Sequence, residues 1–180
     1  MDEAGCGPLA GPVIAGAVIL KTFDFTCRID DSKKLSPKRR EAAYDEIVKK
    51  AHVGIGIVGE DIIDDINIYR ATIKAMESAI ANLGAVPDYV IVDGRVRLST
   101  KCPIKCIVGG DSKSMSIAAA SIVAKVTRDR MMDDYHRRYP QYGFGKHKGY
   151  PTREHKKAIA DHGPSPIHRK SFRPVREYSI

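Results

Sequence analysis

Two adjacent carboxylates, Asp2 and Glu3, stand directly before a glycine-rich segment that contains Gly5, Gly7 and Gly11. Neighbouring side chains of a strand point to opposite faces, so both acids reach one site only where the chain bends. Glycine permits such a bend and lets backbone N–H groups approach a ligand closely. Carboxylates suit a hard cation and amides suit a phosphate or hydroxyl, so the pattern favours a metal-dependent site for a polyanion. An acidic N-cap followed by a turn fits these residues equally well.

Two further acids, Asp93 and Asp111, stand at or just after the ends of expected strands. Functional groups of α/β proteins gather at strand ends, so these acids can meet Asp2 and Glu3 at one sheet edge. Four close carboxylates repel one another unless cations neutralise them, and Mg²⁺ prefers such oxygen ligands. Two ions about 4 Å apart can activate a water and stabilise the leaving oxygen in phosphodiester cleavage. The alternative is that these strand-end acids only cap loops.

The elements that must position these acids follow from periodicity and punctuation. Apolar runs bounded by turn residues predict strands over 13–20, 53–58, 87–94 and 104–108. Helical spacing of apolar and small residues predicts helices over 38–50, 66–83, 114–139 and 152–162. Ser36 and Pro37 mark the start of the first helix, and Asp61 or Asp64 is expected to cap the second.

Strands that alternate with helices indicate the α/β class, with a mainly helical segment after Pro140. We expect one domain over 1–180, with a sheet-and-helix core to about residue 140 and a C-terminal loop and helical segment over about 141–180. With 180 residues, 43% hydrophobic and 29% charged, the composition is that of a globular protein. No apolar run reaches the ~20 residues that cross a bilayer, and no signal peptide is visible, so we expect a cytoplasmic protein with no membrane partner.

The net charge of +8 is concentrated in basic clusters at 33–40, 137–138, 146–148 and 168–170. Basic clusters that recur along a folded chain predict nucleic acid binding. Solvated helix faces explain the lysines at 49–50 and 156–157 well. They explain the cluster at 146–148 poorly, because that cluster lies in a Gly/Pro-rich loop beside Tyr150.

Short motifs follow one another along nearly the whole chain: Asp2-Glu3-Ala4-Gly5, Asp31-Ser32-Lys33-Lys34-Leu35, Ile66-Asn67-Ile68, Val92-Asp93-Gly94, Gly110-Asp111-Ser112-Lys113-Ser114, the run 117–129, His147-Lys148-Gly149-Tyr150-Pro151-Thr152 and Pro166-Ile167-His168-Arg169-Lys170-Ser171-Phe172. In this order they make the chain resemble bacterial ribonuclease HII. Any one motif would be a weak signal, but the series is highly specific. The resemblance implies an RNase H-like fold, with a mixed β-sheet flanked by helices and further helices at the C-terminal end.

The resemblance also implies Mg²⁺- or Mn²⁺-dependent hydrolysis of the RNA strand of RNA–DNA hybrids, and incision 5′ to single ribonucleotides embedded in duplex DNA. Such incision serves replication-associated repair and leaves 5′-phosphate products. The family's catalytic, metal-binding acids fall on Asp2, Glu3, Asp93 and Asp111, with two ions expected during catalysis. The partners implied are RNA–DNA hybrid and ribonucleotide-containing duplex DNA. We expect a monomer, and residues 176–180 show no motif that would decide whether a sliding clamp binds.

Two parts of the family's substrate site can be carried over by position. Its turn that senses the ribose 2′-hydroxyl matches Gly5, Cys6 and Gly7, and its tyrosine that stacks on the sugar at the RNA–DNA junction matches Tyr150. The 2′-hydroxyl distinguishes RNA from DNA, and glycine amides can approach it closely. Further substrate contacts, which hold phosphates without reading bases, are expected at Ser32, Lys33, Lys148, His168 and Arg169.

The chain departs from the family pattern at two places. Cys6 replaces an arginine, which removes a positive charge beside the scissile region. Met1 directly precedes Asp2, where the family has several apolar residues, so we expect Asp2 to be held loosely. An RNase HIII-type enzyme is a related alternative, but its added N-terminal domain does not fit before Asp2. The non-enzymatic alternative is a basic hybrid-binding module whose catalysis is weakened or lost.

Overall fold

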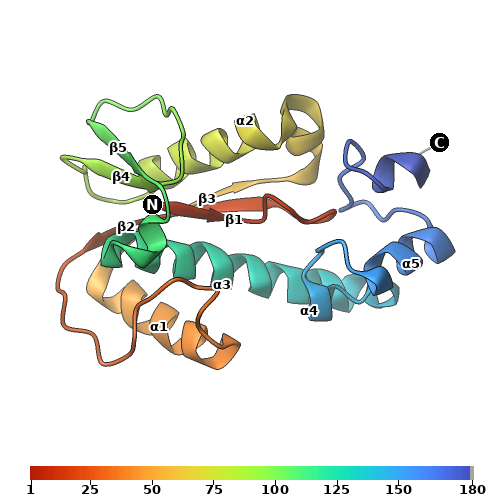
Figure 1. Cartoon of the computed structure of the whole chain (residues 1–180), viewed down its shortest axis with the longest axis horizontal. Coiled ribbons are helices and arrows are strands. Elements are labelled where there is room, and N and C mark those ends of the chain that lie inside the picture. Colours follow the sequence, from red (N-terminus) through yellow and green to blue (C-terminus); the bar gives the residue numbers. More distant parts are fainter. Residues whose placement is uncertain (179–180) are drawn as a thin grey trace.

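A computed structural model describes residues 1–178, and mixed α/β structure runs through this part of the chain (Figure 1). The strands are β1 (Asp2–Ala4), β2 (Val13–Leu20), β3 (Ala51–Val58), β4 (Val90–Asp93) and β5 (Ile104–Ile107). The α-helices are α1 (Pro37–Lys50), α2 (Glu60–Ala81), α3 (Met115–Arg138), α4 (Phe144–His147) and α5 (Arg153–His162). Short 3₁₀ turns lie at Gly110–Ser112, Pro140–Tyr142 and Val175–Tyr178. The expected α/β class and mixed sheet flanked by helices are confirmed.

Strand β1 lies at one edge of a three-stranded sheet, and its start also bonds to β4. It pairs antiparallel with β2, Asp2 opposite Gly16, and β2 pairs antiparallel with β3. On its other side, the backbone nitrogen of Met1 donates to Ile91 O at 2.8 Å, and the Asp93 N–H donates to Met1 O at 3.1 Å. These bonds connect the three-stranded sheet to the parallel pair of β4 and β5. The expectation that Asp2 is loosely held is therefore wrong, because bonds on both flanks hold this end of β1.

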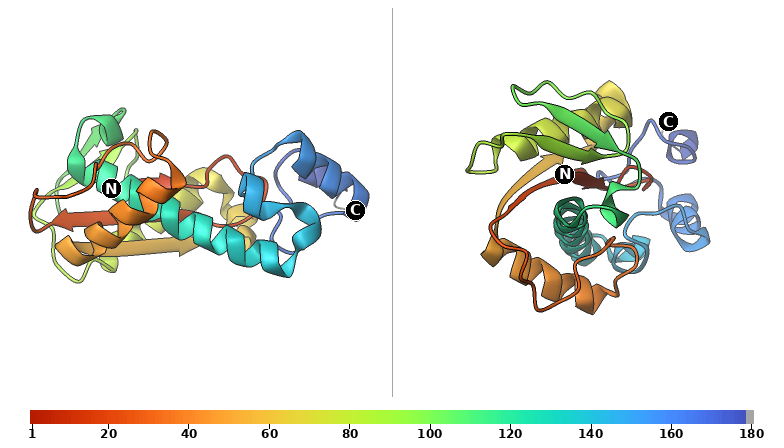
Figure 2. Two further views of the ribbon diagram at one scale, coloured as in Figure 1. Left: turned by 90° about the horizontal axis from the view of Figure 1, so that it is seen from below. Right: turned by 60° about the vertical axis from the view of Figure 1, so that its left-hand side comes forward.

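Helices cover both faces of the sheet at unusually close range, as Figure 2 shows for α2 on one side and α3 on the other. A Cβ atom added at Gly16 of β2 would lie 2.5 Å from Ala120 O of α3. One added at Gly56 of β3 would lie 1.9 Å from Ala75 O of α2. Real Cβ atoms do not come this close, so glycine is required where the helix backbones touch the strands. Helix α1 packs on the outer side of α3 and also contacts β3 (Figure 2).

Helix α2 differs from the prediction at its start. It begins at Glu60 after Gly59 and contains a break at Asn67, where φ is 67°. The Asn67 side chain accepts the N–H of Arg70 at 3.1 Å, so it caps the second part of the helix. The expected cap at Asp61 or Asp64 is wrong. Asp64 accepts two backbone N–H groups of the C-terminal segment, at 170 and 171, instead.

The C-terminal segment returns to the start of the chain. Helix α3 extends beyond the sheet and carries α4 and α5 at its far end (Figure 1). From there, residues 165–169 run beside the loop 5–12, where the Gly11 N–H donates to Ile167 O and the Arg169 N–H donates to Leu9 O. The two ends of the sequence therefore form one structural unit. No helix of the described part is long and apolar enough to cross a membrane.

Candidate active site

Three buried or half-buried aspartates from three separate elements meet at one point. Asp2 lies in β1, Asp93 ends β4, and Asp111 lies in the 3₁₀ turn after β5. One carboxylate oxygen of each falls within 4.8 Å of the other two, and we call these residues the acidic cluster. Their convergence agrees with the expectation that acids at neighbouring strand ends share one sheet edge. All ligand atoms are carboxylate oxygens, which is the donor set that Mg²⁺ and Mn²⁺ prefer.

Local backbone contacts hold the cluster in place. Asp93 accepts the Gly110 N–H at 2.7 Å, which ties the end of β4 to the turn that carries Asp111. Asp2 accepts the N–H of Glu3 at 2.8 Å. The carboxylates are thus positioned by the sheet before any ion binds.

Glu3 lies beside the acidic cluster and is not one of its three members. Its pKa is raised by burial and then by the charge of Asp93. Burial, followed by the charge of Glu3, raises the pKa of Asp2 to about 7. Carboxylates that are pressed together away from water favour any ligand that supplies positive charge. The site therefore fits a divalent cation, with Glu3 available at its edge.

The glycine turn at 5–7 is held from behind by two buried arginines. Arg169 donates to Gly5 O at 2.6 Å and to Cys6 O at 3.2 Å, while Arg128 donates to the carbonyls at 10 and 12. Gly5 has φ 102°, and a Cβ there would lie 2.3 Å from Arg128 Nε, so only glycine fits. Within residues 1–178, the backbone N–H groups of Cys6 and Gly7 donate no hydrogen bond. The turn therefore has donors available for a ligand.

Tyr150 lies against this turn. Its ring carbon Cε1 is 3.7 Å from the position that a Cβ would take at Gly7, and 42% of the residue is exposed. Lys125 Nζ and Arg128 Cζ each lie 6.0 Å from the ring centroid. The sequence-predicted turn and tyrosine are thus neighbours, although they are far apart in the sequence.

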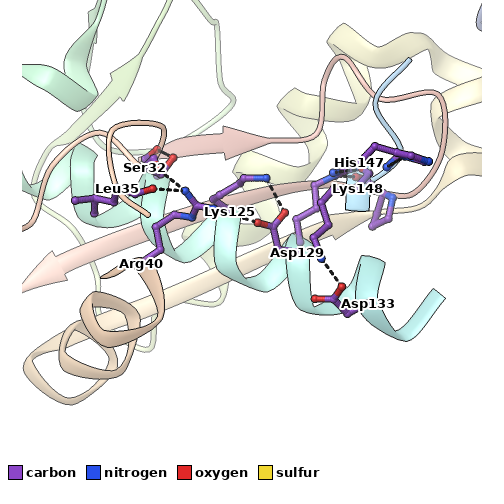
Figure 3. Close-up of polar contacts among 12 residues, drawn as sticks. Ser32, Leu35, Arg40, Lys125, Asp129, Asp133, His147 and Lys148 are labelled. Carbon is purple, nitrogen blue, oxygen red and sulfur yellow. Dashed lines mark hydrogen bonds and ion pairs between the residues drawn. The ribbon is translucent and has the colours of Figure 1, made fainter. Parts of the chain in front are cut away.

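A pocket of about 540 Å³ opens beside Tyr150, between α1, α3 and α4. Its cations are organised by carboxylates, as Figure 3 shows: Lys125 bonds Asp129 at 2.6 Å, and Lys148 pairs with Asp133. Arg40, on the same wall, donates to the carbonyls at 32 and 35 (Figure 3). Arg40 and Lys125 were not among the substrate-binding residues expected from sequence. Both could have been considered from sequence, because Lys125 lies in the family-like run 117–129 and Arg40 lies in the basic cluster 33–40.

The five residues expected to contact the phosphates of the substrate lie in different surroundings. Lys33 is exposed. Partial loss of hydration acts to lower its pKa, but the charges of Asp31 and then of the acidic cluster outweigh this effect and raise it. Ser32 is buried, with its hydroxyl 2.8 Å from that of Ser121. Lys148 is paired with an aspartate at the pocket wall.

For His168 and Arg169 the prediction of direct substrate contact needs correction. Both side chains are buried, at 1% and 0% exposure. The His168 ring nitrogens bond Ser165 and His155, and the Arg169 guanidinium bonds backbone carbonyls of the loop 5–12. A basic cluster in sequence does not reveal that its cation points inward, because the buried carbonyls that pair with it belong to a distant segment.

Comparison with known proteins agrees with this geometry. The family model for ribonuclease HII matches residues 1–175. Ribonuclease HII of Bacillus cereus (strain B4264) is 51% identical over 98% of this chain and 69% of its own length, and that of Bacillus thuringiensis (strain Al Hakam) is 52% identical with the same coverage.

Solved structures show the same fold. Ribonuclease H2 from Pyrococcus horikoshii OT3 superposes with a TM-score of 0.81 at 26% identity, covering 98% of this chain and 94% of that one. RNase HII from Archaeoglobus fulgidus, solved in complex with PCNA, gives 0.79 at 26% identity, covering 93% and 91%. A Bst-RNase HIII mutant, at 18% identity, shares the fold. With the family match over nearly its full length and relatives at half identity, the chain belongs to the ribonuclease HII family, whose ribonuclease H activity acts on RNA–DNA hybrids.

Proposed function

We propose that this protein is a divalent-metal-dependent endoribonuclease that also incises duplex DNA on the 5′ side of a single embedded ribonucleotide. One observation carries the proposal. Asp2 of the acidic cluster lies in β1, and β1 runs directly into the glycine turn, against which Tyr150 lies. The carboxylates of β1 that can hold a cation and the turn that can recognise a sugar therefore follow one another directly along the chain.

Asp2, Asp93 and Asp111 would hold the metal, with Glu3 as a further ligand at the edge. Bound Mg²⁺ or Mn²⁺, two ions during catalysis, supplies an activated water and stabilises the leaving oxygen of phosphodiester hydrolysis. The protein's own part is to fix the carboxylates through the sheet and the Asp93–Gly110 bond. Cleavage then leaves a 5′-phosphate on the downstream strand.

The sugar at the cleavage site would be recognised from two sides. The free N–H groups of Cys6 and Gly7 are donors for a 2′-hydroxyl, the group that distinguishes RNA from DNA. The exposed ring of Tyr150 offers a stacking surface for the next sugar, where an added hydroxyl would not fit. Lys33, which interacts with the charges of the acidic cluster, and Lys125, which lies beside the Tyr150 ring, would hold phosphates and so fix the register without reading bases.

The test uses a DNA duplex with one ribonucleotide, in Mg²⁺ or in Mn²⁺. We expect a nick on the 5′ side of the ribonucleotide, no cleavage of the all-DNA duplex, and loss of the nick with EDTA or in Asp111→Asn. The matched control is Asp88→Asn, which makes the same chemical change at an exposed position outside the acidic cluster. Binding of the duplex without a nick in either metal would support the alternative of a catalytically inactive hybrid-binding module.

Two partner predictions stay open to measurement. We propose that the protein acts as a monomer, which light scattering of the purified chain would check. Binding to a sliding clamp is undetermined, and the last two residues of the stretch 176–180 lie outside the described part of the chain.

A further inference from the structure

Two histidines of the C-terminal segment are buried and play no part in the site described above. His155 of α5 and His168 are 0% and 1% exposed. Their Nε2 atoms lie 3.0 Å apart, so one ring must donate a proton and the other must accept it. A direct contact of this kind requires defined protonation states in both rings.

The neighbours of the two rings determine which ring donates. His155 Nδ1 lies 2.9 Å from the carbonyl oxygen of Tyr150, which can only accept, so Nδ1 carries the proton. A neutral ring has one N–H, so His155 Nε2 accepts from His168 Nε2–H. His168 Nδ1 is then an acceptor, and it receives the Ser165 N–H at 2.8 Å. One directed chain of hydrogen bonds thus runs from Ser165 to the Tyr150 backbone.

Both rings stay neutral at physiological pH. Burial lowers the pKa of His155 to about 4 and that of His168 to about 3. The chain of bonds is therefore complete under the conditions in which the protein works.

The residue after His168 holds the opposite side of the sugar site. Arg169 donates to the carbonyls of Gly5, Cys6 and Gly11, which shape the turn at 5–7. Consecutive residues of one strand-like segment therefore reach two loops: Arg169 reaches the glycine turn, and His168 reaches the Tyr150 loop through His155. Other bonds hold the residues just before Tyr150, such as Leu9 N–H to the carbonyl at 149. His155 is the one connection from another element to the Tyr150 carbonyl itself within the described residues.

We propose that His168, acting through His155 on the Tyr150 loop, and Arg169, acting on the glycine turn, together set the spacing between the turn and Tyr150. This spacing determines selectivity for a ribonucleotide followed by a deoxyribonucleotide. This inference rests on the proposed function and adds residues that touch neither metal nor substrate. His155, His168 and Arg169 are positioning residues.

The Tyr150 loop needs such support. Lys148 and Gly149 have positive φ angles of 51° and 83°, a conformation that a lysine adopts only when its surroundings impose it. A recognition group must be held within about 0.5 Å of its working position. Bonds within the loop, from Tyr150 N–H to His147 O and from Thr152 N–H to Tyr150 O, fix its local shape, and the histidine pair ties the Tyr150 carbonyl to the C-terminal segment. Without that tie, we expect the ring to lose its fixed distance from Gly7.

The test compares two substrates in His155→Leu and in His168→Asn, which each break the link between the rings. The readout is the ratio of kcat/KM on a single-ribonucleotide duplex to kcat/KM on a uniform RNA–DNA hybrid. We expect this ratio to fall about tenfold or more, in line with the cost of a small misplacement. Ile47→Ala is the control: it removes buried volume in α1, away from both loops, and we expect it to leave the ratio unchanged.

A double-mutant comparison separates positioning from general damage. With Tyr150→Ala in place, adding His155→Leu is expected to leave the ratio as it is, because the group being positioned is gone. A ratio within twofold of wild type in the folded histidine variants overturns the inference, as does a full effect in the Tyr150→Ala background. If His155→Leu does not fold, His168→Asn decides the matter alone. Failure of wild type to nick the single-ribonucleotide duplex would instead refute the proposed function.

Discussion

Arg169→Met gives a strong test of the view that a buried arginine shapes the sugar-sensing turn. The guanidinium is fully buried and donates to three backbone carbonyls, at 2.6 Å to Gly5, 3.2 Å to Cys6, and 2.7 and 2.9 Å to Gly11. No carboxylate of the described residues forms an ion pair with it. Methionine keeps the apolar volume of the stem but cannot replace these hydrogen bonds.

The magnitude follows from two opposing terms. A buried carbonyl that loses a charged donor costs about 1.5–3 kcal/mol, so three carbonyls cost about 5–9 kcal/mol. Removing the buried charge returns part of this, since burial, followed by repulsion from Arg128, lowers the pKa of Arg169 to about 10, which corresponds to about 3 kcal/mol. The expected net loss in free energy of unfolding is about 2 to 6 kcal/mol. Against a total of about 5–15 kcal/mol, the variant is strongly destabilised.

Urea unfolding followed by circular dichroism measures this loss, because the chain contains no tryptophan for fluorescence. Arg176→Met is the control, since Arg176 is exposed and its replacement is expected to change the free energy by less than about 0.5 kcal/mol. Cleavage of the single-ribonucleotide duplex, measured on the folded fraction, is expected to fall as well. A loss below about 1 kcal/mol together with unchanged cleavage would refute the reasoning.

The buried histidines, the glycine contact between β2 and α3, and the charge beside the turn can each be tested. The buried histidines 155 and 168 have lowered pKa values, so between pH 7 and pH 5 the unfolded chain binds more protons than the folded one. The free energy of unfolding is therefore expected to fall by about 2 kcal/mol per histidine over this range. Urea titrations of a His155→Leu, His168→Asn double variant are expected to show a flatter pH dependence. Gly16→Ala is expected to cost about 1–3 kcal/mol and to lower cleavage, because the added Cβ meets Ala120 O and separates α3 from β2; a thermal midpoint equal to wild type would contradict this. Cys6→Arg is expected to raise cleavage of the single-ribonucleotide duplex by adding a cation beside the turn, and unchanged kinetics at subsaturating substrate would count against it.

Much of the fold was predictable because its signals are local. The Ser36 side chain accepts the N–H of Arg39 and caps α1, as the Ser-Pro pair indicates. Apolar runs marked β2, β4 and β5 within a few residues. The break in α2 was not predictable, because an asparagine with positive φ has no distinct pattern in sequence.

The order of residues along the chain shows which groups are available for chemistry: acids at strand ends, glycines in a turn, and a tyrosine in a basic loop. Which of these groups meet depends on how the elements pack. That packing places Asp2, Asp93 and Asp111 within 4.8 Å of one another with Glu3 beside them, and it turns His168 and Arg169 inward. The reason is physical, since the partners that bury a charged or polar side chain lie far away in the sequence. For Arg169 they are the carbonyls of the turn behind Asp2 and Glu3.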